Sequence, residues 1–165
     1  MPSSDQGVTH DRYMLVPRTL VFATRHNQVL LLEGAPDKRL WAGRYNGVGG
    51  HVERGEDVLQ TARREFAEET GLELVDPWLC GVVTVDVGQD VGVGIFVFRG
   101  MCSTGDLKPS TEGTLAWVPF EQVGDLPLVE DLYVLLPRLL AMQPGDPPFA
   151  AQYSYNETGK LIIKM

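Results

Sequence analysis

The chain has 165 residues, 44% of them hydrophobic and 22% charged, which is typical of one soluble globular domain with a substantial core. Its 22 acidic residues outnumber its 14 basic ones, giving a formal net charge of -8. This charge argues against a nucleic-acid polymer as partner, whereas a small polyphosphate can bind an acidic protein through a metal ion. No apolar run is long enough to span a bilayer, and the first dozen residues lack the apolar core of a secretion signal. We therefore expect no membrane association and a cytoplasmic location.

The polar residues 1–12 predict a flexible tail, and residues 13–165 a single domain. Residues 18–26 and the run VLLLEG from Val29 predict two strands joined by a tight turn, at the first edge of a sheet. Apolar side chains alternate onto both faces of the first strand. We therefore expect this strand to be covered on both sides.

Residues 34–45, GAPDKRLWAGRY, predict a loop that leads into the glycine-rich sequence NGVGG. Besides Lys38 and Arg39, the loop carries Arg44, whose guanidinium can pair with a phosphate through two hydrogen bonds. Leu40 and Trp41 can cover the face of a base. The loop is therefore a candidate substrate-binding segment.

Residues 57–70 predict a helix, because Val58, Ala62 and Phe66 recur four apart. Gly71 follows at the position where helices commonly end in the left-handed conformation. The helix should therefore pack one apolar face against the sheet.

Three carboxylates gather at the end of this predicted helix. At about 100° per residue, Glu65 and Glu69 point to the edge of the apolar face, and Glu68 lies about a quarter turn farther round. An acidic helix end can simply be a solvated surface held by ion pairs. Carboxylates beside an apolar stripe, however, repel one another and resist desolvation unless a cation neutralises them. Oxygen ligands alone favour Mg²⁺ or Mn²⁺ over zinc.

The spacing around this helix carries a family resemblance: Gly50, five residues, Glu56, seven residues, then REFAEETGL. This pattern resembles the Nudix box at every defined position. The resemblance implies an α+β fold of the Nudix type, an α/β/α sandwich with a central mixed sheet. The helix 57–70 would lie on one side of the sheet and a helix 129–142 on the other. It also implies an enzyme that hydrolyses a diphosphate bond in a nucleoside diphosphate linked to another group.

The resemblance further implies roles for the residues of the box. Arg64 would orient a glutamate, and Glu56 would fix the preceding loop against the helix. The general base would be Glu65 or Glu112, the latter in a polar loop 103–112 that often supplies an acid in this family. The implied metal ligands are Glu65, Glu68, Glu69 and the Gly50 carbonyl.

Residues 78–87 and 91–102 predict a hairpin of β-branched, apolar strands. If its turn centres near Asp90 and Val91, Cys80 and Cys102 fall close to opposite each other. We therefore expect the two cysteines to be near neighbours. Free thiols are favoured over a disulfide in a cytosolic chain.

The rest of the chain predicts a strand from Leu115, a helix 129–142 and a terminal hairpin around residues 156–159. Pro137 should kink or break the helix, which should pack opposite the helix 57–70.

Further stretches resemble the MutT-type branch, which hydrolyses oxidised purine nucleoside triphosphates. WAGRYNGVGGHV resembles that branch where an asparagine, here Asn46, contacts the base, and Glu130 and Asp131 match paired acids that recognise the purine edge. Acids in a first helical turn are also favoured by the helix dipole alone.

We therefore expect magnesium-dependent (or manganese-dependent) hydrolysis of a nucleoside triphosphate to monophosphate and pyrophosphate, by a monomer or homodimer. The alternatives are a hydrolase of ADP-ribose or another nucleoside diphosphate compound, or a nucleotide-sensing module without catalysis.

Overall fold

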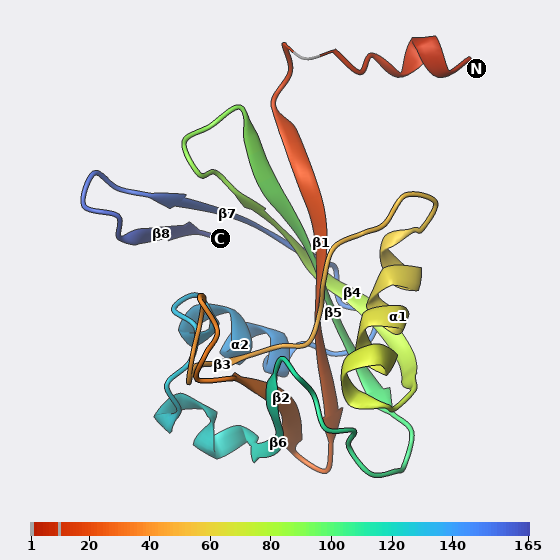
Figure 1. Ribbon diagram of the computed structural model, residues 1–165, viewed down its shortest axis with the longest axis vertical. Coiled ribbons are helices and arrows are strands. Elements are labelled where there is room, and N and C mark those ends of the chain that lie inside the picture. The colour runs from red at the N-terminus through yellow and green to blue at the C-terminus, as the bar shows by residue number, and fades with distance from the viewer. Residues whose placement is uncertain (1, 10) are drawn as a thin grey trace.

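Alternating apolar residues build an eight-stranded mixed sheet with an α-helix packed on each face (Figure 1). The computed structural model describes residues 2–9 and 11–165, while Met1 and His10, both in the predicted tail 1–12, lie outside the described residues. The strands are β1 (Met14–Arg25), β2 (Gln28–Gly34), β3 (Tyr45–Asn46), β4 (Leu74–Val85), β5 (Val91–Cys102), β6 (Gly113–Pro119), β7 (Phe149–Tyr155) and β8 (Leu161–Lys164). The helices are η1 (Ser3–Gln6), α1 (Val58–Thr70), η2 (Phe120–Asp125) and α2 (Leu132–Ala141).

This architecture confirms the predicted α+β class with a central mixed sheet. The strands follow the order β3-β2-β1-β5-β4-β7-β8, with β6 paired to β2. Pairs β1–β5 and β4–β7 are parallel, and the other named pairs are antiparallel. No helix in the described part of the chain is long and apolar enough to cross a bilayer.

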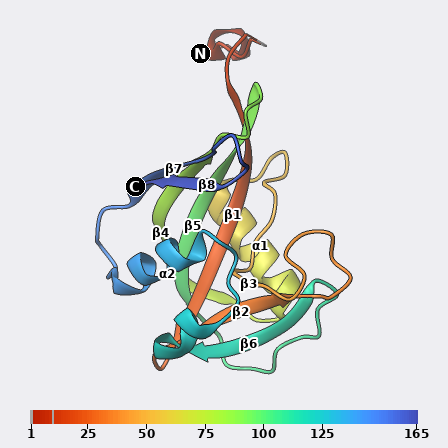
Figure 2. The same ribbon diagram turned by 90° about the vertical axis from the view of Figure 1, so that its left-hand side faces the viewer.

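The prediction that β1 and β2 form the first edge of the sheet is wrong, because β1 lies in its interior (Figure 2). β1 pairs in parallel with β5 along most of its length and meets β2 only at Thr24 and Arg25. A parallel partner some 75 residues away leaves no local turn pattern in the sequence. The tight turn itself is present, with His26 and Asn27 both at positive φ, as a two-residue hairpin requires.

Both faces of β1 are covered, as its sequence predicts. Val21 and Ala23 pack in the core beneath α1 with Phe66, and Phe22 packs on the opposite face in the core beneath α2. All four side chains are fully buried. Strand β1 therefore fixes the position of α1 relative to the rest of the sheet.

Helix α1 begins and ends where its sequence indicates. The Asp57 side chain accepts hydrogen bonds from the backbone N–H groups of Leu59 and Gln60, and the Gln60 side chain accepts one from the Asp57 N–H. This reciprocal capping box satisfies donors that a helix start leaves unpaired. Gly71 ends the helix with φ 75°, in the left-handed region.

Helix α2 is shorter than the predicted 129–142, because Val129 still belongs to the preceding extended segment and bonds to the Tyr45 carbonyl. The helix packs on the face opposite α1, as expected. Pro137 does not break it, because Leu136 and Leu139, on either side of the proline, are fully buried and anchor the helix to the sheet.

The prediction that Cys80 and Cys102 are near neighbours is wrong. In the β4–β5 pair Cys102 lies opposite Leu74, and Cys80 falls at an irregularity between Leu79 and Gly81. Cys80 packs in the core beneath α2, while Cys102 packs against the core beneath α1. Both thiols are free, and their pKa values are raised by burial, that of Cys80 to about 12.

Candidate active site

Strand β1 positions the glycine segment that precedes α1. The Thr19 N–H donates to the Gly50 carbonyl at 2.9 Å, and Val21 N–H donates to the Val48 carbonyl at 2.7 Å. A Cβ at Gly49 would collide with the Thr19 carbonyl, and one at Gly50 would occupy the space of the Glu65 carboxylate. Glycine at these two positions therefore permits close approach of backbone to strand and of Glu65 to backbone.

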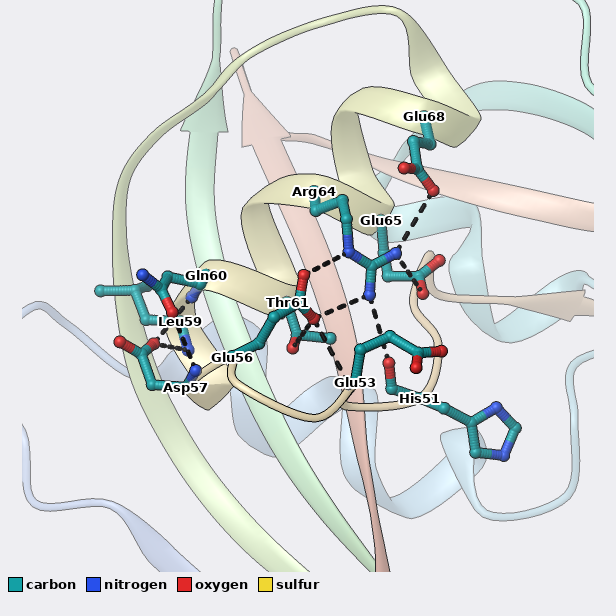
Figure 3. A network of polar contacts seen from close by, with 10 residues as sticks. All are labelled: His51, Glu53, Glu56, Asp57, Leu59, Gln60, Thr61, Arg64, Glu65 and Glu68. Carbon is teal, nitrogen blue, oxygen red and sulfur yellow. Dashed lines mark hydrogen bonds and ion pairs between the residues drawn. The ribbon is translucent and has the colours of Figure 1, made fainter.

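Arg64 is the centre of a polar network on α1 (Figure 3). Its Nε and Nη2 donate to the two carboxylate oxygens of Glu56 at 2.7 and 3.0 Å, a two-pronged contact. Its Nη1 donates to Glu65 Oε1 at 2.9 Å and to Glu68 Oε2 at 3.3 Å, and its Nη2 to the His51 carbonyl at 3.3 Å. Arg64 thus joins the glycine segment, the loop before the helix and two box glutamates.

Glu56 ties that loop to the helix. Besides Arg64, its carboxylate accepts hydrogen bonds from the Thr61 hydroxyl at 2.8 Å and the Glu53 N–H at 3.3 Å. The hydrogen bonds from Arg64, and next that from Thr61, lower the pKa of Glu56 to about 2. The carboxylate is therefore ionised at any physiological pH.

The three box glutamates differ in environment. The Glu65 side chain is 18% exposed and that of Glu68 61%, and both contact Arg64. Glu69 is half-buried, and its buried Oε2 has no hydrogen-bond partner among the described residues. Burial, and then the negative charges of Glu65 and Glu112, raise the pKa of Glu69 to about 7.

The predicted convergence of box carboxylates is only partial. Among residues 2–9 and 11–165, no three carboxylate, imidazole or thiol groups stand close enough together to hold one ion. The reason is that Arg64 draws Glu65 and Glu68 toward itself. The Gly50 carbonyl, the fourth predicted ligand, accepts one hydrogen bond from Thr19 and keeps a second lone pair.

Glu112 is held by the loop that follows β2. The Lys38 ammonium lies 2.7 Å from Glu112 Oε2, and the Ala35 N–H donates to the Glu112 carbonyl at 3.0 Å. The two loops 35–44 and 103–112 are thereby joined beside Glu69, whose pKa responds to both Glu112 and Lys38.

A cavity of about 220 Å³ opens between these loops, β1 and the start of α2. It brings together most of the predicted substrate-binding side chains with two of the predicted catalytic or metal-binding acids. Predicted site residues that line it are Leu40, Trp41, Arg44, Asn46, Glu69, Glu112 and Asp131. Gly50, Glu65, Glu68 and Glu130 do not line it, and Glu130 is exposed to solvent.

Backbone pairing between β3 and the segment before α2 builds the far wall of the cavity. Tyr45 N–H donates to the Pro127 carbonyl, and Val129 N–H donates to the Tyr45 carbonyl, both at 3.0 Å. This pairing sets Asn46 and Asp131 on one wall. Burial raises the pKa of Asp131.

Arg44 is partly committed to structure, since its Nη1 donates to the Leu128 carbonyl at 3.2 Å. Leu40 and Trp41 are 63% and 44% exposed at the rim of the cavity. Their exposed apolar surface is available to a bound base.

Sequence reasoning missed two residues that line this cavity. Arg18 and Thr19 line it from β1, and the buried Thr19 hydroxyl has no hydrogen-bond partner among the described residues. Their place arises from strand pairing, which the sequence pattern does not reveal. Lys38, which the sequence indicated as a base of the loop, also lines the cavity.

Known proteins match this sequence and this fold. Residues 14–139 match the family model described as the NUDIX domain. The chain belongs to the Nudix family. Over 123 residues it is 31% identical to the mouse oxidized purine nucleoside triphosphate hydrolase, spanning 74% of this chain and 78% of that one. The zebrafish (Danio rerio) protein of the same name is 32% identical over 111 residues, 64% of this chain and 70% of that one.

Solved structures agree with this membership. The MutT protein from Bacillus halodurans superposes with a TM-score of 0.78 at 26% identity, covering 91% of this chain and 97% of that one. A MutT protein from Methanosarcina mazei has a TM-score of 0.65 at 25% identity, over 76% and 93% of the two chains. These matches confirm the predicted MutT-like Nudix hydrolase, an enzyme of the pyrophosphohydrolase class.

Proposed function

We propose that this Nudix hydrolase cleaves a diphosphate bond of a nucleoside triphosphate with an oxidised purine base, releasing nucleoside monophosphate and pyrophosphate. Two relatives named for that activity support the choice of substrate. The arrangement of the cavity supports it as well, since Asn46 and Asp131 share one wall and Glu69 lies on the lining beside Glu112.

The observation that carries the proposal is the Glu69 carboxylate. A buried carboxylate oxygen without a hydrogen-bond donor is costly, and native proteins pair such groups or supply a ligand. The charges of Glu65 and Glu112 make this position more negative still. A divalent cation fits the site because it would satisfy the oxygen and reduce the repulsion among the three carboxylates.

Mg²⁺ or Mn²⁺ is the cation that an all-oxygen donor set favours. Glu69 would hold it together with Glu65, Glu68 and the Gly50 carbonyl. When bound, such a cation would supply positive charge to the phosphates and to the attacking water. Glu68 is exposed and bonds Arg64 at 3.3 Å, so exchanging this contact for a metal costs little.

The other residues supply positioning and proton transfer. Arg64 holds Glu65, and the glycine at position 50 leaves room for that carboxylate. Either Glu65 or Glu112 accepts the proton of the attacking water. Lys38, which pairs with Glu112, and Arg44 line the cavity and would offer positive charge to the phosphates.

Another set of side chains would bind the base of the substrate. Leu40 and Trp41 would cover the base from the rim, while Asn46, Glu130 and Asp131 would read its edge. Glu130 would have to approach from outside the cavity lining, since its side chain is exposed.

One experiment tests the proposal. The protein is incubated with Mg²⁺ and a panel of normal and oxidised nucleoside triphosphates, ADP-ribose and dinucleoside polyphosphates, with a chelator as the control. We expect monophosphate and pyrophosphate from oxidised purine triphosphates, and no product with the chelator. Turnover confined to ADP-ribose would contradict the substrate class, and nucleotide binding without any product would indicate a sensor.

A further inference from the structure

The side chains of Lys38 and Glu112 form an ion pair in the lining of the cavity. Lys38 Nζ donates to Glu112 Oε2 at 2.7 Å, from the loop after β2 to the loop before β6. Three cationic side chains line the cavity, on Arg18, Lys38 and Arg44, and within residues 2–9 and 11–165 only that of Lys38 is in an ion pair. A cation suited to phosphate and a candidate general base thus occupy each other.

The backbone joins the two loops without help from this ion pair. The Ala35 N–H donates to the Glu112 carbonyl, and the Lys38 N–H donates to the Ala35 carbonyl, both at 3.0 Å. Gly34 and Gly113 are paired where β2 ends and β6 begins. The Lys38 and Glu112 side chains can therefore separate while both backbones stay in place.

The ion pair is also easily exchanged. Its two side chains are 35% and 50% exposed, and an exposed pair typically changes an equilibrium by no more than about fivefold. Lysine carries its charge on a flexible stem, so the ammonium can change partner without a movement of the chain. A phosphate monoester carries about −1.5 to −2 charges near neutral pH, more than a single carboxylate, and can therefore compete for the ammonium.

Both partners act on the Glu69 carboxylate, which lines the same cavity. The charge of Glu112 raises the pKa of Glu69, and the charge of Lys38 lowers it. A carboxylate bound to an ammonium is a weaker base than a free one, because the cation favours the ionised form. Departure of the Lys38 ammonium would therefore make Glu112 a better proton acceptor.

We propose that Lys38 exchanges partners when the substrate binds: its ammonium leaves Glu112 for a phosphate oxygen, and the Glu112 carboxylate is thereby released. This inference rests on the proposed function for the identity of the ligand. Hydrogen bonds and ion pairs change in the exchange, and no covalent bond forms or breaks. A phosphate in the cavity thus frees a candidate base, whereas a ligand without phosphate leaves the ion pair closed.

The test is binding of 8-oxo-dGMP and of its nucleoside to the full chain without metal, measured by calorimetry. Lys38→Met should weaken the monophosphate about tenfold, as expected for the loss of a hydrogen bond between charged groups. Glu112→Gln should tighten it about threefold, because a neutral amide holds the ammonium less firmly than a carboxylate does. The nucleoside lacks the phosphate and should bind the parent and both variants within about twofold.

A double-mutant cycle distinguishes exchange from a general effect of charge. If Glu112→Gln acts through Lys38, it should change monophosphate affinity by less than about 1.5-fold in the Lys38→Met protein. A general loss of negative charge would instead tighten binding equally in both backgrounds. Glu73→Gln and Lys160→Met make the same charge changes at exposed positions outside the cavity lining and should leave the affinity within about 1.5-fold, because solvent and salt screen them.

Equal tightening in both backgrounds would overturn the inference. So would Glu112→Gln binding the monophosphate no more tightly than the parent, undetectable binding by both included, or Lys38→Met weakening nucleoside and monophosphate alike. The expected cycle without turnover of any triphosphate would instead overturn the proposed function and leave the exchange standing. Turnover of oxidised purine triphosphates without the expected cycle would do the reverse.

Discussion

The Arg64 network and the cavity beside it differ in how far their polar groups are satisfied. In the network, the Glu56 carboxylate accepts from Arg64, Thr61 and the backbone of Glu53. In the cavity, two buried oxygens, on Thr19 and Glu69, have no partner among the described residues, and the hydroxyl of Tyr153, which does not line the cavity, is a third. Within residues 2–9 and 11–165, these three are the buried side-chain polar atoms without a hydrogen bond.

This contrast separates structural support from ligand binding. A satisfied charge network makes the loop before α1 rigid, and it holds Glu65 against the glycine segment. Unsatisfied buried groups lower stability and persist where a ligand completes them. Helix α1 thus carries both a residue of the hydrogen-bonded network, Arg64, and a residue with an unpaired buried oxygen, Glu69.

The largest loss of turnover should come from replacing Glu69, whose buried carboxylate oxygen has no hydrogen-bond partner among the described residues. Glu69→Gln removes the charge that a cation would meet and should lower turnover of 8-oxo-dGTP about a thousandfold or more, with circular dichroism unchanged. Glu73→Gln, the same change at an exposed position just past the helix, serves as the matched control. Turnover by Glu69→Gln within tenfold of the parent would remove Glu69 from the site.

Breaking the Arg64 network should lower both activity and stability. Arg64→Met leaves Glu56 and Glu65 without their main partner, and we expect about a hundredfold loss of turnover and a lower free energy of unfolding. Arg64→Lys should recover little, because a lysine cannot make the two-pronged contact to Glu56. Urea unfolding and initial rates check both expectations, and an Arg64→Met protein with full activity would show that the network does not position Glu65.

The pH dependence of stability distinguishes the two regions by sign. Glu69 has a folded pKa of about 7, above the 4.5 of an unperturbed glutamate, so its contribution is present below pH 4.5 and is lost as pH rises through 7. The gap in unfolding free energy between Glu69→Gln and the metal-free parent should therefore grow from pH 4.5 to pH 7.5, by on the order of 2 kcal/mol. Glu56 behaves oppositely: its stabilisation is present above pH 4.5 and is lost as pH falls toward 2. A gap that stays constant with pH would show that Glu69 is not desolvated.

The smallest loss of turnover is expected for a substitution at Gly50, which lies against the Glu65 carboxylate. An alanine at position 50 would displace the Glu65 carboxylate, a flexible group that can swing away at little cost in folding. Gly50→Ala should therefore lower turnover about tenfold while changing the free energy of unfolding by less than about 1 kcal/mol. A stability loss several times larger, with turnover reduced in proportion to the folded fraction, would place the cost in the backbone instead.

Local patterns in the sequence predict the network well and the cavity poorly. The helix and its end at Gly71 depend on neighbours within four residues, and the structure has them as expected, with Asp57 capping the helix instead of belonging to it. The directions of Glu65, Glu68 and Glu69 on the helix also follow from its period. The contact of Arg64 with Glu56 spans only eight residues.

Distant pairing explains what the sequence did not reveal. Thr19 meets Gly50 because β1 lies inside the sheet, beside a segment some thirty residues farther along the chain. The misplacement of Cys80 opposite Cys102 came first from the turn, which lies nearer the start of the chain than expected, since Val85 pairs with Val93, and two irregularities then shift the register of β4 and β5 further. A bulge leaves no sequence pattern as clear as that of a helix cap.

The central claim is that the unpartnered oxygen of Glu69 receives a divalent cation. Direct titration of Mn²⁺ into the full chain at pH 7.5, followed by the loss of its free paramagnetic signal, tests this without relying on turnover. We expect the parent and Glu73→Gln to bind Mn²⁺ alike and Glu69→Gln to bind at least tenfold more weakly. Equal Mn²⁺ affinity in all three proteins would contradict the account.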